Sequence, residues 1–245
     1  MQLDATHLRD FYRTPLGQVV RRQLSNRIRA RWKNVDGFTI LGSGFATPYL
    51  GSFRSEAGRL GCLMPARQGA LVWPHGERCH SVLVEEHHWP IPDNSVDRLL
   101  AVHCLEAAEH VGPVLREMWR VLAPDGRLIL IVPNRRGVWS RIDTTPFGQG
   151  LPFSRSQLER QLTDALFTPV DWSEALYFPP FGRRLLLHMA PAMERSLAKV
   201  SAGVAGVIIV EARKELMAPV IGGVRSSSVR ILKPVESGTA RRAGE

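Results

Sequence analysis

The chain has 245 residues, of which 44% are apolar and 22% charged, and its net charge is +9. This composition is ordinary for a globular protein, and the length suits a single domain with a substantial core. The sequence has no apolar run of about 18 residues and no apolar segment after a basic start, so we expect neither a transmembrane helix nor a signal peptide. Cys62, Cys79 and Cys104 are widely spaced, which favours reduced thiols, a cytoplasmic location and no metal site.

Positive charge is concentrated at the two ends of the chain. Residues 1–36 hold eight Arg or Lys against three Asp, and residues 222–245 hold five against two Glu. An enzyme acting on nucleic acid is expected to carry a basic stripe beside its site instead. Nucleic acid is therefore an unfavoured partner.

The first 36 residues predict helices. Thr6 is a candidate cap for a short helix, and Thr14-Pro15 offers a capping hydroxyl followed by proline for a second one. Apolar residues recur along one side of this second helix, at Leu16, Val20, Leu24, Ile28 and Trp32. We expect that stripe to pack on the rest of the chain and the basic face to be solvated. A helix lying on a membrane surface is the alternative.

A first buried strand is predicted over residues 38–41, and a second over 60–65. Gly42, Ser43 and Gly44 form the turn after the first strand, and Thr47-Pro48 is a further helix start. Glycines permit a tight turn and let a ligand approach backbone atoms. Because ligands of open α/β sheets bind at the carboxyl ends of the strands, this turn is a candidate binding site.

Residues 82–134 show a strand–helix–strand pattern. Apolar runs occupy 82–84, 98–102 and 127–132, and apolar residues between the last two follow helical spacing from Val111 to Leu122. Residues 123–126 are expected to break that helix. The pattern predicts a parallel sheet whose strands are covered on both faces.

The last third of the chain begins with a long loop over 134–154, rich in glycine and proline. Ser154 is a candidate cap for a helix over 157–166. We expect a sixth strand starting at 176–178, a helix over 185–197 and a last strand over 202–212. The predicted organisation is an N-terminal helical segment (1–36) covering the site, one domain (37–220) and a mobile basic tail (221–245).

The stretch 82–134 also resembles the middle of class I S-adenosylmethionine-dependent methyltransferases of the small-molecule, type 11-like kind. The matching positions, in the family's order, are Glu85, Trp89-Pro90-Ile91, Asp93, Ser95-Val96-Asp97, Arg120-Val121-Leu122 and Pro124-Asp125-Gly126. The resemblance implies a doubly wound, Rossmann-like sheet of seven mostly parallel strands with the last one antiparallel, in three αβα layers. It also implies S-adenosyl-L-methionine as cofactor, S-adenosyl-L-homocysteine as product and a small-molecule acceptor.

The resemblance assigns candidate site residues. The implied cofactor contacts are Gly42, Ser43, Gly44, Met64, Pro65, Glu85, Glu86 and His103. His103 is also the candidate catalytic acid or base, because the unperturbed pKa of histidine lies near neutral pH. Candidates to cover the site or to grip an anionic or aromatic acceptor are Tyr12, Arg135, Arg136, Trp139 and Arg141.

Two alternatives stay open. The family has acidic residues where this chain has Ile40 and Met64, which favours a non-catalytic methyltransferase fold kept for regulation or partner binding. A nucleotide-dependent oxidoreductase would require G-x-G-x-x-G and a later acidic residue. Thr47 stands at the third glycine position, so this second alternative is unfavoured.

Overall fold

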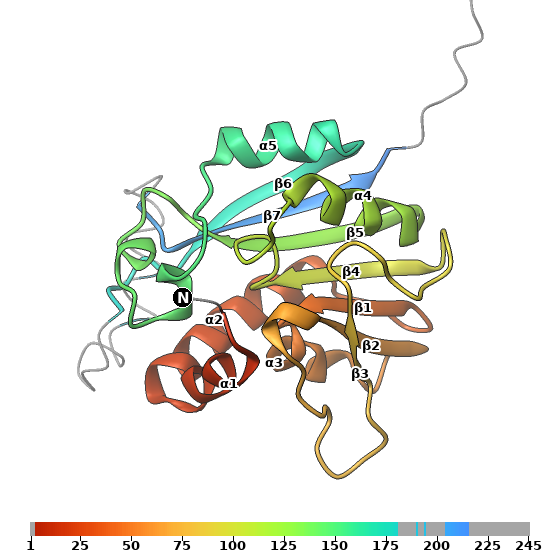
Figure 1. Cartoon of the computed structure of the whole chain (residues 1–245), viewed down its shortest axis with the longest axis horizontal. Coiled ribbons are helices and arrows are strands. Elements are labelled where there is room, and N and C mark those ends of the chain that lie inside the picture. Colours follow the sequence, from red (N-terminus) through yellow and green to blue (C-terminus); the bar gives the residue numbers. More distant parts are fainter. Residues whose placement is uncertain (1–2, 181–189, 191–193, 195–203, 216–245) are drawn as a thin grey trace, which may run out of the picture.

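The structure is a computed structural model that describes residues 3–180, 190, 194 and 204–215. Seven strands form one sheet in the order β3-β2-β1-β4-β5-β7-β6 (Figure 1). Their bounds are β1 (Thr39–Gly44), β2 (Arg59–Pro65), β3 (Ser81–Val84), β4 (Val96–Val102), β5 (Leu122–Pro133), β6 (Phe167–Ala175) and β7 (Val207–Lys214). All pairs among β1 to β5 are parallel, and β7 is antiparallel to both β5 and β6. The predicted sheet is confirmed.

Helices cover both faces of the sheet (Figure 1). One face carries α1 (Ala5–Arg13), α2 (Pro15–Arg31) and α3 (Thr47–Leu50), and the other carries α4 (Val111–Val121) and α5 (Arg155–Asp164). Short 3₁₀ turns are η1 (Gly51–Phe53), η2 (Ala66–Gln68), η3 (Trp139–Arg141) and η4 (Pro146–Gly148). The arrangement is the expected three-layer αβα sandwich.

Helix starts follow the predicted side-chain capping in two of four cases. α3 begins at Thr47, as predicted, but its cap is Ala46 and no side chain caps it. The hydroxyl of Thr14 accepts from the backbone N–H of Gly17, and that of Ser154 accepts from Gln157, as predicted. The prediction for the first helix was wrong. Asp4 is its cap, since the carboxylate of Asp4 accepts from the N–H of Thr6 at 2.7 Å.

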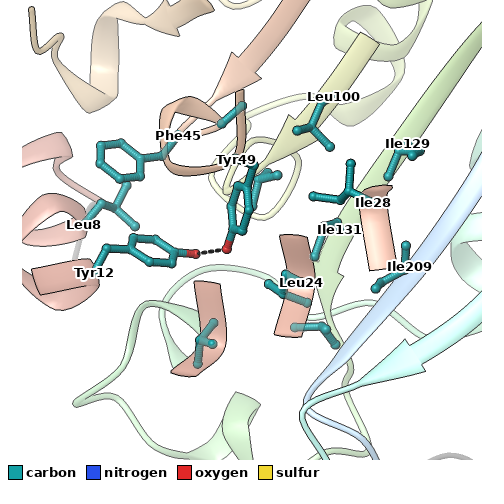
Figure 2. Close-up of a cluster of buried hydrophobic side chains, with 14 of the residues drawn as sticks. Leu8, Tyr12, Leu24, Ile28, Phe45, Tyr49, Leu100, Ile129, Ile131 and Ile209 are labelled. Atoms are coloured by element: carbon teal, nitrogen blue, oxygen red, sulfur yellow. Dashed lines mark hydrogen bonds between the residues drawn. The ribbon is translucent and has the colours of Figure 1, made fainter. Parts of the chain in front are cut away.

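The alternation of side chains along the strands creates two cores. Ile129 and Ile131 face α2, whereas Leu128 and Leu130 pack with the residues of α4 and α5. Figure 2 shows the α2 side of the sheet, where Leu24 and Ile28 lie beside Ile129, Ile131 and Ile209. The apolar stripe of α2 is therefore buried against the sheet, as expected, and does not face a membrane surface. Within the described ranges, no helix has both the length and the apolar character needed to cross a membrane.

Some boundaries in the second half of the chain differ from the prediction. The sixth strand is Phe167–Ala175 and not the segment from 176, because Leu166 adopts a positive φ of 62° and turns the chain directly from α5 into β6. Leu176 and Phe178, the residues that suggested a strand, pack in the core instead. β5 already begins at Leu122 and runs through the predicted turn, with Asp125 at a φ of 62°. The predicted helix over 185–197 and the tail from 221 lie outside the described residues, apart from residues 190 and 194.

The order of the strands locates a crevice. β1 and β4 are neighbours, but the chain continues from β1 to β2 on one side and from β4 to β5 on the other. Such a switch point, at the carboxyl ends of the strands, is where ligands bind in open α/β sheets. The turn at Gly44 and the segment after Val102 meet there.

Candidate functional site

The turn after β1 lies directly against the end of β4. The N–H of Phe45 donates to the carbonyl of Val102 at 2.8 Å. Gly44 has a φ of +74°, and a Cβ atom at this position would lie 2.5 Å from the carbonyl oxygen of Val102 and 2.9 Å from that of His103. The glycine is therefore required by the close approach of the two chain segments as well as by its backbone conformation.

His103 is fully buried at the end of β4 and belongs to a chain of polar side chains. Its Nδ1 lies 3.2 Å from a carboxylate oxygen of Glu106, and its Nε2 lies 2.9 Å from the hydroxyl of Tyr12. That hydroxyl lies 2.7 Å from the hydroxyl of Tyr49 (Figure 2). We call Tyr49, Tyr12, His103 and Glu106 the buried relay.

One set of protons accounts for every hydrogen bond within the buried relay. If Nδ1–H of His103 donates to the carboxylate of Glu106, Nε2 is free to accept from the hydroxyl of Tyr12. Tyr12 then accepts from Tyr49. Burial raises the pKa of both phenols, although the hydrogen bond to Tyr12 and the positive charge of Arg21 oppose the rise at Tyr49. Both hydroxyls are therefore protonated at neutral pH and able to donate.

The other residues assigned to the cofactor fill the crevice with their own contacts. The hydroxyl of Ser43 lies 3.3 Å from the sulfur of Cys104, and Met64 accepts from the N–H of Leu71 through its thioether. Gln68 is buried and its side-chain amide donates to the carbonyl of His103. Gly42 is buried too, and a Cβ there would touch Leu50 and Ala46.

The two predicted acids after β3 differ in position. Glu85 is exposed, and its backbone forms a bridge with His88. Glu86 is half-buried, and its carboxylate accepts from the N–H of Glu109 at 3.2 Å. Only Glu86 borders the small hollow at the carboxyl ends of β2 and β4, which is lined by Pro65, Gln68, Glu86, Cys104, Ala107, Ala108 and Val114.

The hollow at the carboxyl ends of β2 and β4 is too small for S-adenosylmethionine. The hollow beside Pro65 and Gln68 measures about 10 Å³, whereas sites for molecules of this size occupy hundreds of Å³. No carboxylate stands at the end of β2, where Met64 and Pro65 lie. Among the described residues, two buried acceptor atoms, Oε1 of Gln68 and Oε2 of Glu106, have no hydrogen-bond partner. The surroundings of this hollow therefore hold polar groups able to meet a ligand.

The residues predicted in the loop after β5 are not gathered at His103. Trp139 is a core residue, 1% exposed, and its indole N–H donates to the carbonyl of Phe178. The guanidinium of Arg135 donates to Pro152 and Gln157, and Arg136 and Arg141 are exposed. Trp139 reaches the buried relay only indirectly, through the ring of Phe147, which lies 4.8 Å from that of His103.

Three residues of the site were not predicted. Glu106 stands three residues after His103, and this i,i+3 spacing is the one sequence signal that links them. Tyr49 and Gln68 carry no such signal, because their partners lie far away in the sequence.

The central part of the chain is similar to a known protein family. Residues 64–130, from the end of β2 into β5, match the model of the family described as Methyltransferase domain. No curated protein showed significant sequence similarity.

Solved structures share the fold over most of the chain. An S-adenosylmethionine-dependent methyltransferase from Mesorhizobium loti is 14% identical with a TM-score of 0.56, over 77% of this chain and 96% of that one. Geranyl diphosphate C-methyltransferase from Streptomyces coelicolor A3(2), solved with S-adenosyl-L-homocysteine, is 14% identical with a TM-score of 0.54, over 78% of each chain. The [4+2]-cyclase SpnF is 20% identical with a TM-score of 0.51, over 79% of this chain and 80% of that one.

These similarities agree with the topology of the sheet and with the position of the crevice. The family match covers β3, β4 and α4 completely, so it includes the carboxyl end of β4. The family match covers residues 64–130, and the solved structures show that the chain shares the fold of S-adenosylmethionine-dependent methyltransferases.

Proposed function

We propose that this protein transfers a methyl group from S-adenosylmethionine to a small-molecule acceptor, with His103 as the proton acceptor. The observation that carries the proposal is the buried relay at the carboxyl end of β4, inside the segment that matches the methyltransferase family. A buried imidazole held by a carboxylate is a common way to present a nitrogen lone pair to a reacting hydroxyl or amine.

The geometry of His103 defines what the chain itself contributes. Glu106 holds the Nδ1–H tautomer, so that the lone pair of Nε2 points at the hydroxyl of Tyr12. An acceptor hydroxyl or amine that took the place of the Tyr12 hydroxyl would donate to the same atom and pass its proton to it. In the free protein, Tyr12 would then cover Nε2 of His103, and its hydroxyl would occupy the position that the acceptor's hydroxyl or amine takes during the reaction.

Ligand binding requires the crevice to open. Tyr12 on α1 and Gln68 on η2 hold it shut through their bonds to the side chain and the carbonyl of His103. We propose that both side chains move when the cofactor and acceptor bind. The apparent affinity for the cofactor is then the intrinsic affinity of the open form multiplied by the fraction of molecules that are open.

The second candidate function is a non-catalytic partner-binding or regulatory protein with this fold. Two observations favour it, namely the hollow of about 10 Å³ and the missing carboxylate at Met64 and Pro65. The fold alone does not separate the two functions, since one protein that shares it is named a [4+2]-cyclase.

Calorimetric titration of the whole protein with S-adenosylmethionine and S-adenosyl-L-homocysteine tests the proposal, with NAD as the control nucleotide. We expect the first two to bind and NAD not to. Gln68→Ala removes the side chain that closes the crevice and should tighten the binding of both. Gln149→Ala is the matched control, because its amide bonds to Asp143 in an exposed loop. No binding to either the wild type or Gln68→Ala would overturn the proposal and favour the non-catalytic function.

A further inference from the structure

We propose that a groove beside Tyr12 binds a small molecule that carries phosphate or carboxylate groups on an apolar or aromatic body. The groove consists of two adjoining hollows of about 440 and 330 Å³ that share Gln18, Arg21, Pro48 and Gly51. Its walls come from α1, α2, the segment from Phe45 to Ser52 and residues 71–75 after β2. We call it the basic groove.

The basic groove is lined by positive charges and by no negative ones. Arg9, Arg13, Arg21 and Arg22 line it, and no Asp or Glu does. Arg9 is paired with Asp10 at 2.9 Å, and Arg13 lies 4.0 Å from the same carboxylate. Among the described residues, Arg21 and Arg22 have no ion-pair partner. Two guanidinium groups are therefore available to an anionic ligand.

Arg21 lines the same hollow as Tyr49 of the buried relay. Its positive charge lowers the pKa of Tyr49, against the effect of burial. Both hollows contain Arg21, and one contains Tyr49 while the other contains Tyr12. An anion bound at Arg21 would lie beside the two tyrosines that lead to His103.

The opposite wall of the basic groove is apolar. Val72 is 59% exposed there, next to the half-buried Leu71 and Trp73. This wall is held in place by Ser81 at the start of β3, whose hydroxyl accepts from the N–H of Trp73 and donates to the carbonyl of Leu71. An anchored indole beside an exposed aliphatic side chain is a surface on which an apolar or planar group can pack.

The combination selects a class of ligand. Guanidinium groups match the planar geometry of carboxylate and phosphate oxygens, and an apolar wall favours a ligand with a hydrophobic part. The volumes of the hollows lie in the range of small-molecule sites. Because the unpaired charge is gathered in a walled groove and not along a stripe, a small anion fits better than a nucleic-acid backbone.

The position of the basic groove assigns its ligand a role. Tyr12 lines the groove, and its hydroxyl bonds to His103. A molecule in the groove is thus separated from Nε2 of His103 by one side chain. Its assignment as the methyl acceptor rests on the proposed function, whereas anion binding does not.

The test uses 1-naphthyl phosphate and 1-naphthoate as probes, titrated into the whole protein without S-adenosylmethionine and followed by calorimetry. Inorganic phosphate carries only the charged group of these probes, and 1-naphthol carries only their aromatic ring. Their titrations therefore measure the binding of the two parts separately. We expect at least one of the two naphthyl anions to bind in a saturable way, and the two halves to bind more weakly. The stronger of the two anions identifies phosphate or carboxylate as the preferred group.

Variants locate the binding. Arg21→Gln with Arg22→Gln should weaken the binding of the preferred probe about tenfold or more, since two charged hydrogen bonds are lost. Arg59→Gln is the matched control, because Arg59 is an exposed arginine at the other end of β2. Trp73→Ala should weaken the binding of the naphthyl probe but not that of inorganic phosphate.

Two results would overturn the proposal: no saturable binding of either anion, or equal losses in Arg59→Gln and in the double variant. Its failure is distinguishable from that of the proposed function, because the cofactor titration uses no acceptor and the probe titration uses no cofactor. Probe binding without cofactor binding would leave the basic groove as a site and remove the methyl-transfer role.

Discussion

The hydroxyl of Tyr12 lies 2.9 Å from Nε2 of His103, although 91 residues separate the two along the chain. Both side chains are buried, one on α1 and the other at the carboxyl end of β4. Because a buried polar group without a partner is unfavourable, this bond joins the N-terminal helix to the centre of the sheet. In the function proposed above, the same contact closes the crevice and must open for a ligand to bind.

Replacing Tyr12 by Phe should measurably destabilise the fold. The change leaves Nε2 of His103 and the hydroxyl of Tyr49 without their shared partner, which costs about 1–3 kcal/mol of unfolding free energy. Urea denaturation measures the loss. Tyr177→Phe is the control, since the hydroxyl of Tyr177 makes a longer bond of 3.3 Å to Glu174 at a half-buried site. Equal losses of unfolding free energy in the two variants would show that the hydrogen bonds of the buried relay stabilise the fold no more than that of Tyr177.

Alanine variants of Gly44 and Gly37 distinguish the cost of backbone strain from the cost of a steric clash. Both have a positive φ, +74° and +73°, but a Cβ at Gly37 meets nothing within 4 Å while one at Gly44 meets the carbonyl of Val102. Gly37→Ala should therefore cost only the strain of the left-handed backbone, about 1–2 kcal/mol. Gly44→Ala should cost about 1–3 kcal/mol more, through the clash. Thermal denaturation of both variants tests this, and similar melting temperatures would contradict it.

The pair formed by Glu117 and Arg120 should make stability depend on pH. The Glu117 carboxylate accepts from Nε and Nη2 of Arg120 and from the N–H of Trp89, and Arg120 also donates to the carbonyl of Ile91. These bonds, that of Arg120 first, lower the pKa of Glu117 from its ordinary value of 4.5. The carboxylate therefore favours the folded state above this value, and its contribution disappears as the pH falls through the lowered pKa.

The expected result is that Glu117→Gln loses about 1–2 kcal/mol of unfolding free energy at pH 7 and progressively less below pH 4.5. Urea denaturation at a series of pH values measures the difference from the wild type. Glu159→Gln, at an exposed position on α5, should show no such dependence. A loss for Glu117→Gln that stayed constant down to the acid range would count against the ion pair as its cause.

Cys79 should be the one thiol that reacts in the folded protein. It is exposed, and hydrogen bonds with Ser81 lower the pKa of its thiol. Burial raises the pKa of Cys62 and of Cys104 to about 12, so both stay protonated and inaccessible. Titration with a disulfide reagent should release one equivalent per chain, with a half-maximal rate below pH 8.5, the usual value for a free cysteine. Cys79→Ser should remove the signal, and residual fast labelling would refute the assignment.

The sequence by itself determined the local elements and the class of the sheet. Apolar runs at 82–84 and 98–102 predicted strands covered on both faces. Strands form at both places, but only β4 is buried, since β3 is the edge strand and exposes Val82 and Leu83. The caps at Thr14 and Ser154 were predicted because a cap bonds to a backbone group two or three residues away. Leu166 shows the limit of this reasoning, since its positive φ begins β6 without a recognisable turn signal.

Tertiary structure alone decided how the site is built. The sequence identified His103 as a candidate, but its partner Tyr12 comes from the first helix and the carbonyl of His103 is bonded by Gln68. Trp139 was predicted from the sequence to contact the acceptor, but its packing against Phe147 and Phe178 makes it part of the core. The basic groove joins segments that meet only after folding. Periodicity and capping depend on near neighbours in the chain, but a binding site depends on which distant side chains the sheet brings together, and that information lies in the packing.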